Sequence, residues 1–187
     1  QNNIAVIFLG DAAIEEGVFY ESLNYAKVLS LPILFVCENN LFSCFTNIDE
    51  RQPKNLIKKI SKSFDIKTHF MNGNDTIEIL KKSKKIVEEI RSNKQPQFIL
   101  LDTYRMLEHC GPNNDDNLKY RDKREIEKWL DKDPIKLIEN YISKKNKKFL
   151  FEKEKIISKI NLEIKKSFDY AKNSKFPSSK RLKEHLY

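Results

Sequence analysis

The stretch IAVIFLGDAAIEEGVFYESLNYAKVLSLPILFVCENN, residues 4–40, determines the fold class of this chain. It begins with an apolar run at 4–9 and ends with a second run at 33–37. Uninterrupted runs of this length are typical of strands buried on both faces of a parallel sheet. Between them, residues 19–29 carry apolar side chains at helical spacing, and a proline at position 32 marks the exit. Strand, helix and strand in this order predict a right-handed crossover unit of an α/β fold.

The rest of the chain continues with strands and helices. Residues 67–71 predict an edge strand and residues 98–101 a third buried strand. A loop is expected at 41–53, and helices are expected at 55–64, 76–93, 122–131, 134–144 and 151–173. The first helix should bury Phe19, Leu23, Ala26 and Val28, and the helix over 76–93 should bury Ile77, Leu80, Ile86, Val87 and Ile90. We therefore expect a parallel sheet flanked by helices over 1–121 and a helical C-terminal extension over 122–187.

The position of the first strand and the few glycines add two expectations. A central strand needs neighbours on both sides, so sequence upstream of the first residue is expected. Only four glycines occur, and each lies in an expected loop or turn: Gly10, Gly17, Gly73 and Gly111. In a chain so poor in glycine, these positions are expected to mark backbone conformations or close approaches that a side chain would block.

Composition narrows the class of protein. The chain has 187 residues, a net charge of +8 and 33% charged residues, which suits a folded domain with solvated helices. Residues 1–50 hold one basic and seven acidic side chains, and the basic remainder interleaves Lys with Glu and Ile at helical spacing. We therefore expect no nucleic-acid partner. No apolar run is long enough to span a membrane, and Cys37, Cys44 and Cys110 lack CxxC spacing, so we expect a cytoplasmic protein without disulfides or zinc.

Polar side chains follow the first two predicted strands. Asp11 comes directly after the first strand, and Asn40 follows the second. The carboxyl ends of neighbouring parallel strands meet at one edge of the sheet, where such folds bind ligands. Carboxylate and amide oxygens suit Mg²⁺, which commonly takes one or two protein ligands and completes its octahedron with phosphate oxygens. Asp11 as a helix N-cap and Asn40 as a turn residue are the structural alternatives, and phosphatase-like and response-regulator folds also place an Asp at a strand end.

A family resemblance favours the metal site over these alternatives. The stretch GDAAIEEGVFYESLNYAKVLSLPILFVCENN, residues 10–40, closely resembles the thiamine-diphosphate motif of 2-oxo acid dehydrogenase alpha subunits of the pyruvate, branched-chain and acetoin type, which runs from GDG to a closing NN. The resemblance continues through MNGND at 71–75, TYRMLEHCGP at 103–112, YR at 120–121 and DPI at 133–135. It implies the thiamine-diphosphate-binding fold, with this chain as its C-terminal half, and thiamine diphosphate and magnesium as cofactors.

The resemblance also implies roles for individual residues. Asp11 and Asn40 would ligate magnesium through their side chains, and Phe42 through its backbone carbonyl. Gly10, Ala12 and Ala13 would line the diphosphate. His109 matches the family's loop histidine, and this match implies a position near the diphosphate and a catalytic contribution. Tyr104, Arg105, Tyr120 and Arg121 match positions that order the loop around the site.

The implied function is that of a dehydrogenase component that decarboxylates a 2-oxo acid and transfers the acyl group to a lipoyl carrier. A beta subunit and a lipoyl-bearing acyltransferase are the implied partners, in a heterotetramer of alpha and beta chains. The glutamate that activates the cofactor comes from the beta subunit in this family, so this chain alone is expected to be inactive.

Two departures from the family pattern leave alternatives open. Ala12 stands where the motif usually has Gly, and Glu15 stands where it usually has Asn. An added methyl group and an added negative charge beside the diphosphate both predict a weaker cofactor site. The alternatives are a related thiamine enzyme, such as an acetoin dehydrogenase or a carboligase, and a non-catalytic scaffold with a relict motif.

Overall fold

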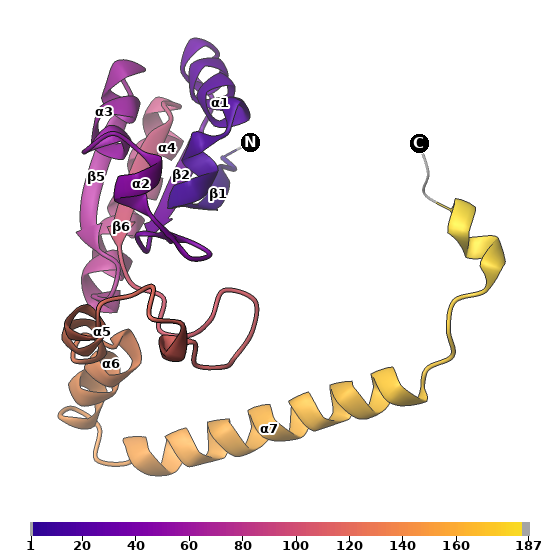
Figure 1. Cartoon of the computed structure of the whole chain (residues 1–187). Helices are drawn as coiled ribbons and strands as arrows, with labels where there is room; N and C mark the ends of the chain where they lie inside the picture. The colour runs from indigo at the N-terminus through magenta and orange to yellow at the C-terminus, as the bar shows by residue number, and fades with distance from the viewer. Residues whose placement is uncertain (1, 185–187) are drawn as a thin grey trace. The chain divides into compact units, whose positions relative to one another are not determined.

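The computed structural model describes residues 2–184, and its N-terminal part is built around a four-stranded parallel sheet (Figure 1). The strand order is β1 (Ala5–Gly10), β2 (Ile33–Asn39), β6 (Gln97–Asp102) and β5 (Lys67–Asn72). All three strand pairs are parallel, with Gly10 opposite Glu38 and Asn39 opposite Asp102. The carboxyl ends of β1, β2 and β6 therefore lie at the same edge of the sheet. The predicted parallel α/β fold and the edge position of β5 are confirmed.

The two central strands carry the core on both of their faces. Phe35 and Cys37 of β2 point to a cluster shared with α1 (Gly17–Val28) and α3 (Leu56–Ser63). Leu34 and Val36 point to the opposite cluster, which is covered by α4 (Thr76–Asn93). Residues of β6 alternate in the same way, because successive side chains of a strand point to opposite faces. The sheet is thus a layer between helices.

The prediction that the first strand is buried on both faces is wrong for the described chain. Val6 is 44% exposed, Ile7 40% and Phe8 68%. The reason is position: β1 ends the sheet order and pairs with β2 alone among the strands that the structure describes. A run of apolar residues indicates that a strand can be buried. It does not indicate whether other segments of the chain cover that strand.

Two helix positions also differ from expectation, for a geometric reason. Val28 is 71% exposed and Leu80 is 55% exposed. At about 100° per residue, Val28 points half a turn away from Phe19, nine positions earlier. On α4, Ile79 packs against the cluster that buries Ile86 and Ile90, whereas Leu80 points to the side. The remaining residues named for these two helix faces are buried or half-buried.

Residues 41–53, expected to be a loop, contain short regular elements. Strands β3 (Phe42–Ser43) and β4 (Thr46–Asn47) form an antiparallel hairpin, which is followed by α2 (Ile48–Arg51). The Asn47 side chain caps α2 by accepting a hydrogen bond of 2.9 Å from the backbone N–H of Asp49. This hairpin matters for the site, because it turns the chain back toward the end of β1.

The helices after residue 122 belong to two compact units, residues 1–139 and 140–187. Helix α5 (Lys123–Leu130) lies in the first unit, and α6 (Pro134–Ser143) spans the division. The domain boundary expected after residue 121 falls inside the first unit, because Ile126 of α5 is buried with Phe42 and Tyr104. Helix α7 (Phe149–Asn173) belongs to the second unit. Three short 3₁₀ helices complete the set in the part of the chain that the structure describes: η1 (Asp11–Glu15), η2 (Asp116–Leu118) and η3 (Ser179–Lys183). Within residues 2–184, none of the helices combines the length and the apolar character needed to cross a membrane.

Candidate functional site

Asp11 and Asn40 lie next to each other at the carboxyl ends of β1 and β2. The backbone N–H of Asn40 donates a hydrogen bond of 3.3 Å to Oδ1 of Asp11. Asp11 is 1% exposed, although it is charged. A buried carboxylate needs compensating partners, because desolvation penalises its charge. The two residues that the sequence pairs as metal ligands are therefore adjacent in the fold.

The partner of the second Asp11 oxygen is a residue that the sequence did not single out. Nη2 of Arg51 lies 2.5 Å from Oδ2 of Asp11, and Nη1 of the same guanidinium donates to Oε1 of Glu15. Gln52 donates to the carbonyl of Asp11 at 2.9 Å and to Oε1 of Glu15 at 2.7 Å. We call Asp11, Glu15, Arg51 and Gln52 the Asp11 cluster. Arg51 and Gln52 lie about forty positions from Asp11, so only the hairpin and α2 bring them there.

A strained turn positions Asn40 and Phe42. Leu41 has φ of 71°, in the left-handed region that non-glycine residues rarely adopt. Oδ1 of Asn40 accepts a hydrogen bond of 3.1 Å from the N–H of Phe42, which holds this turn. The Phe42 ring is buried and packs edge-on against Tyr104 at 6.3 Å and Tyr120 at 5.6 Å between ring centroids. Packing of the ring therefore fixes the backbone whose carbonyl is the predicted third ligand.

The remaining residues of the predicted diphosphate cradle follow β1. Ala12 is half-buried and Ala13 is exposed, and both lie in η1. A Cβ added to Gly10 would meet no atom within 4 Å, and the same holds for Gly17. The expectation that glycine marks a close approach is wrong for these two positions and right for Gly73, where an added Cβ would lie 2.9 Å from the carbonyl of Asp102. The fold itself leaves open space beside Asp11 at Gly10.

His109 lies in the long loop after β6 and is exposed. No hydrogen bond among the described residues joins it to Asp11 or Asn40. Hydrogen bonds from Arg105 hold the loop in place. Its Nη2 donates to the carbonyl of Cys44 and to the Tyr120 hydroxyl, both at 2.7 Å. Arg105 thus ties the loop to the hairpin that follows Asn40.

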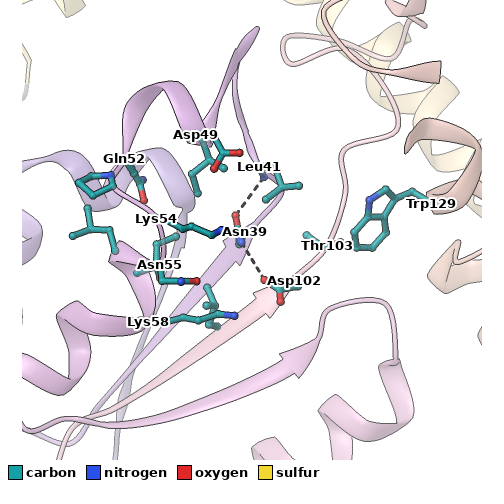
Figure 2. A pocket seen from close by; sticks show the side chains of 15 residues that line it. Asn39, Leu41, Asp49, Gln52, Lys54, Asn55, Lys58, Asp102, Thr103 and Trp129 are labelled. Carbon is teal, nitrogen blue, oxygen red and sulfur yellow. Dashed lines mark hydrogen bonds between the residues drawn. The ribbon is translucent and has the colours of Figure 1, made fainter. Parts of the chain in front are cut away.

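A pocket of about 490 Å³ adjoins the Asp11 cluster (Figure 2). Gln52 belongs to both, and Trp129 lies across the pocket from Gln52 and Lys54. Asn39 also lines the pocket and links the ends of β2 and β6. The Nδ2 of Asn39 donates a hydrogen bond of 3.0 Å to Oδ1 of Asp102. The pocket combines apolar walls with a few polar groups, which is typical of small-molecule sites.

The residues present fit a magnesium ion that also binds an external anion. Asp11 and Asn40 carry hard carboxylate and amide oxygen atoms, which accept hydrogen bonds from Asn40, Arg51 and Phe42. Oε1 of Gln52 is buried without a hydrogen-bond partner. Residues 2–184 contain no group of three or more His, Cys, Asp or Glu that could hold a metal by itself. Two protein side chains leave several positions of an octahedron to other oxygens, as Mg²⁺ sites built around phosphates do.

Tyr104 gives a pH-dependent prediction for the packing behind the site. Burial, and then the carboxylate of Glu125, raise the pKa of Tyr104 from 10.0 to about 12. Between pH 10 and 12 the unfolded state therefore ionises first and binds fewer protons, so the free energy of unfolding should fall as pH rises. In Tyr104→Phe this loss should be smaller. Urea unfolding at pH 8 and pH 10.5 measures it, with Tyr170→Phe, at a residue 78% exposed, as the control. An equal loss in wild type and Tyr104→Phe would contradict the assignment.

Comparison with known proteins places the chain in a family. The family model described as "Dehydrogenase E1 component" matches residues 1–180. The chain is 31% identical over 186 residues to the pyruvate dehydrogenase E1 component subunit alpha of Rickettsia bellii, a match that covers all of this chain and 56% of that protein. It is 29% identical over 143 residues to a mitochondrial 2-oxoisovalerate dehydrogenase subunit alpha of Arabidopsis thaliana, covering 76% of this chain and 30% of that one.

Among solved structures, a transketolase from Campylobacter jejuni matches with a TM-score of 0.45 and 20% identity, over 54% of this chain and 15% of that chain. The sequence matches are more extensive, and in the first of them the chain spans about half the length of the relative. Because the family model covers nearly the whole sequence, the chain belongs to the dehydrogenase E1 component family.

Proposed function

We propose that this chain is the part of a 2-oxo acid dehydrogenase alpha subunit that binds the diphosphate of thiamine diphosphate through magnesium. The observation that carries the proposal is the contact between Asn40 and Asp11 at two adjacent strand ends, with Asp11 almost fully buried. Membership of the E1 family supports the choice of cofactor. A diphosphate beside Asp11 and Glu15 would be repelled unless cations lay between them.

The protein groups have distinct roles in this proposal. Asp11 and Asn40 would hold the ion through their side chains, and Phe42 would hold it through its carbonyl. The open space at Gly10 and the exposed Ala13 of η1 leave room for the diphosphate. When bound, thiamine diphosphate supplies the nucleophilic carbon and the electron sink that decarboxylation of a 2-oxo acid requires.

The loop after β6 would complete the site. Arg105 holds the loop on the hairpin, and His109 is exposed and accessible to a ligand or a partner. We propose that His109 orients the diphosphate and assists transfer of the acyl group to a lipoyl carrier. The relatives are named as alpha subunits, and we propose a beta subunit and a lipoyl-bearing acyltransferase as partners, in a heterotetramer. A cytoplasmic location is proposed because Cys37, Cys44 and Cys110 are free thiols.

The test is titration calorimetry of thiamine diphosphate on the assembled protein that contains this chain. With Mg²⁺ present we expect binding, and with the metal removed by a chelator we expect the affinity to fall at least about a hundredfold, because the ion bridges like charges. Binding of thiamine diphosphate that is unchanged by the chelator would contradict the magnesium site. Absence of binding in both conditions would favour the non-catalytic scaffold, which is the second candidate because Arg51 already occupies Asp11.

A donor screen with pyruvate, branched 2-oxo acids and acetoin distinguishes the thiamine enzymes from one another. Turnover of a 2-oxo acid with reduction of a lipoyl group is the expected result. Turnover of acetoin alone, or carbon–carbon bond formation without lipoyl reduction, would instead assign the chain to an acetoin dehydrogenase or a carboligase.

A further inference from the structure

Arg51 holds the position that a cation bound to Asp11 would take. Its side chain is 9% exposed, and all three nitrogen atoms of the guanidinium donate hydrogen bonds. Nε donates to the carbonyl of Thr46 at 3.2 Å, Nη1 to Glu15 and Nη2 to Asp11. Both oxygens of Asp11 are therefore engaged, one by Asn40 and one by Arg51.

A divalent ion on Asp11 and the guanidinium in this position would repel each other. The carboxylate is almost fully buried, so the repulsion is screened less than it would be in water. Metal binding to Asp11 therefore requires Nη2 of Arg51 to leave it. The other two contacts of Arg51 can persist, because Glu15 and Thr46 bind different nitrogen atoms.

We propose that Arg51 is an internal cation that competes with the divalent metal for Asp11, and that Glu15 is the second anchor onto which Arg51 withdraws when metal and diphosphate bind together. The inference rests on the proposed function, since it concerns the same site. It gives a specific role to Glu15, the residue that departs from the family motif, because Glu15 retains Arg51 beside the site after Asp11 is released. The freed Nη2 would then be available to donate to the incoming anion.

The first experiment measures binding of Mn²⁺ alone by electron paramagnetic resonance, with the assembled protein that contains this chain. Arg51→Gln should bind Mn²⁺ at least about tenfold more tightly than wild type, because the competing charge is gone. Arg91→Gln removes the same charge from an exposed position of α4 and should change the affinity less than about twofold. Equal tightening in both variants would overturn the proposal, since a general charge effect would explain it.

A second pair of variants reverses the direction and does not depend on the folding of Arg51→Gln. In Glu15→Gln, Arg51 loses its second anchor and should remain on Asp11, so Mn²⁺ binding should weaken at least about fivefold. Glu16→Gln removes the same charge from the neighbouring exposed side chain and should weaken it less than about twofold. Equal weakening in both variants would overturn the role given to Glu15.

Thiamine diphosphate separates failure of this inference from failure of the proposed function. When thiamine diphosphate is added together with Mn²⁺, the affinity for Mn²⁺ should rise more in wild type than in Arg51→Gln. The reason is that only wild type must displace Arg51 from Asp11. If wild type binds Mn²⁺ alone as tightly as Arg51→Gln does, the competition is absent and the metal site stands. If no variant binds Mn²⁺ with or without thiamine diphosphate, the proposed function itself fails.

Discussion

Replacing Asp11 by Asn should lower the affinity for thiamine diphosphate in the presence of Mg²⁺ at least about a hundredfold, a loss beyond that typical of groups that only support a metal ligand. The side chain keeps its size but loses the charge that faces the ion. Calorimetry with the assembled protein measures the affinity. A second expected result is that the chelator sensitivity of binding disappears, because the variant no longer uses the ion.

Asp102→Asn is the matched control for this prediction. Asp102 ends β6 at the same edge of the sheet, one strand beyond β2, and accepts a hydrogen bond from Asn39. The same change there should alter the affinity less than about threefold, because Asp102 is outside the proposed ligand set. Unfolding curves of both variants check that the fold persists, since Asp11 also binds Arg51. If Asp11→Asn binds the cofactor as wild type does, Asp11 is not a metal ligand.

Arg121→Gln should lower the free energy of unfolding by about 3–5 kcal/mol, the range observed when one partner of a buried ion pair is removed. The Arg121 side chain is 1% exposed and that of Asp115 is 5% exposed. Arg121 donates to Asp115, to Asp116 at 2.8 Å and to the carbonyl of Arg105, and it stacks over Tyr120 at 5.0 Å. The substitution would leave the Asp115 charge buried without its main partner.

Urea unfolding at neutral pH measures the loss of unfolding free energy in Arg121→Gln. Two further variants show whether the buried ion pair is its cause. Arg124→Gln removes a charge from an exposed position three residues later and should change stability by less than about 0.5 kcal/mol. The double variant Arg121→Gln with Asp115→Asn should recover part of the loss, because a neutral amide needs no counter-charge. A loss in Arg121→Gln no larger than in Arg124→Gln would show that the ion pair does not hold the loop.

The loop that Arg121 organises explains why this stability matters for the site. Arg105, Tyr120 and Arg121 join the beginning and end of the loop that carries His109. Tyr104 packs on the same loop and stacks on Trp129 of α5, with ring centroids 5.5 Å apart. The sequence singled out Tyr104, Arg105, Tyr120 and Arg121 as loop-ordering positions. In the structure the two tyrosines pack against Phe42, and the two arginines bind the loop through Tyr120 and the Arg105 carbonyl.

The sequence by itself determined the strands of the parallel sheet, the longer helices and the adjacency of Asp11 and Asn40. Apolar runs mark strands that can be buried, and parallel crossover units place the polar residues after those strands at one edge. Both signals are local in the chain, so a pattern of side chains is enough to detect them. The long helix α4 and the buried strand β6 were found in the same way.

Tertiary structure alone decided the rest. Arg51 reaches Asp11 because a hairpin of two short strands, followed by one turn of helix, folds back over the end of β1. The spacing of apolar residues in the sequence does not indicate such a contact. Among residues 2–184, β1 pairs only with β2 in the sheet and is exposed, and its own apolar sequence does not show this. The position of Asp11 beside Asn40 was therefore predictable, but the cation that neutralises it was not, because charge pairing between distant segments is fixed by the path of the chain.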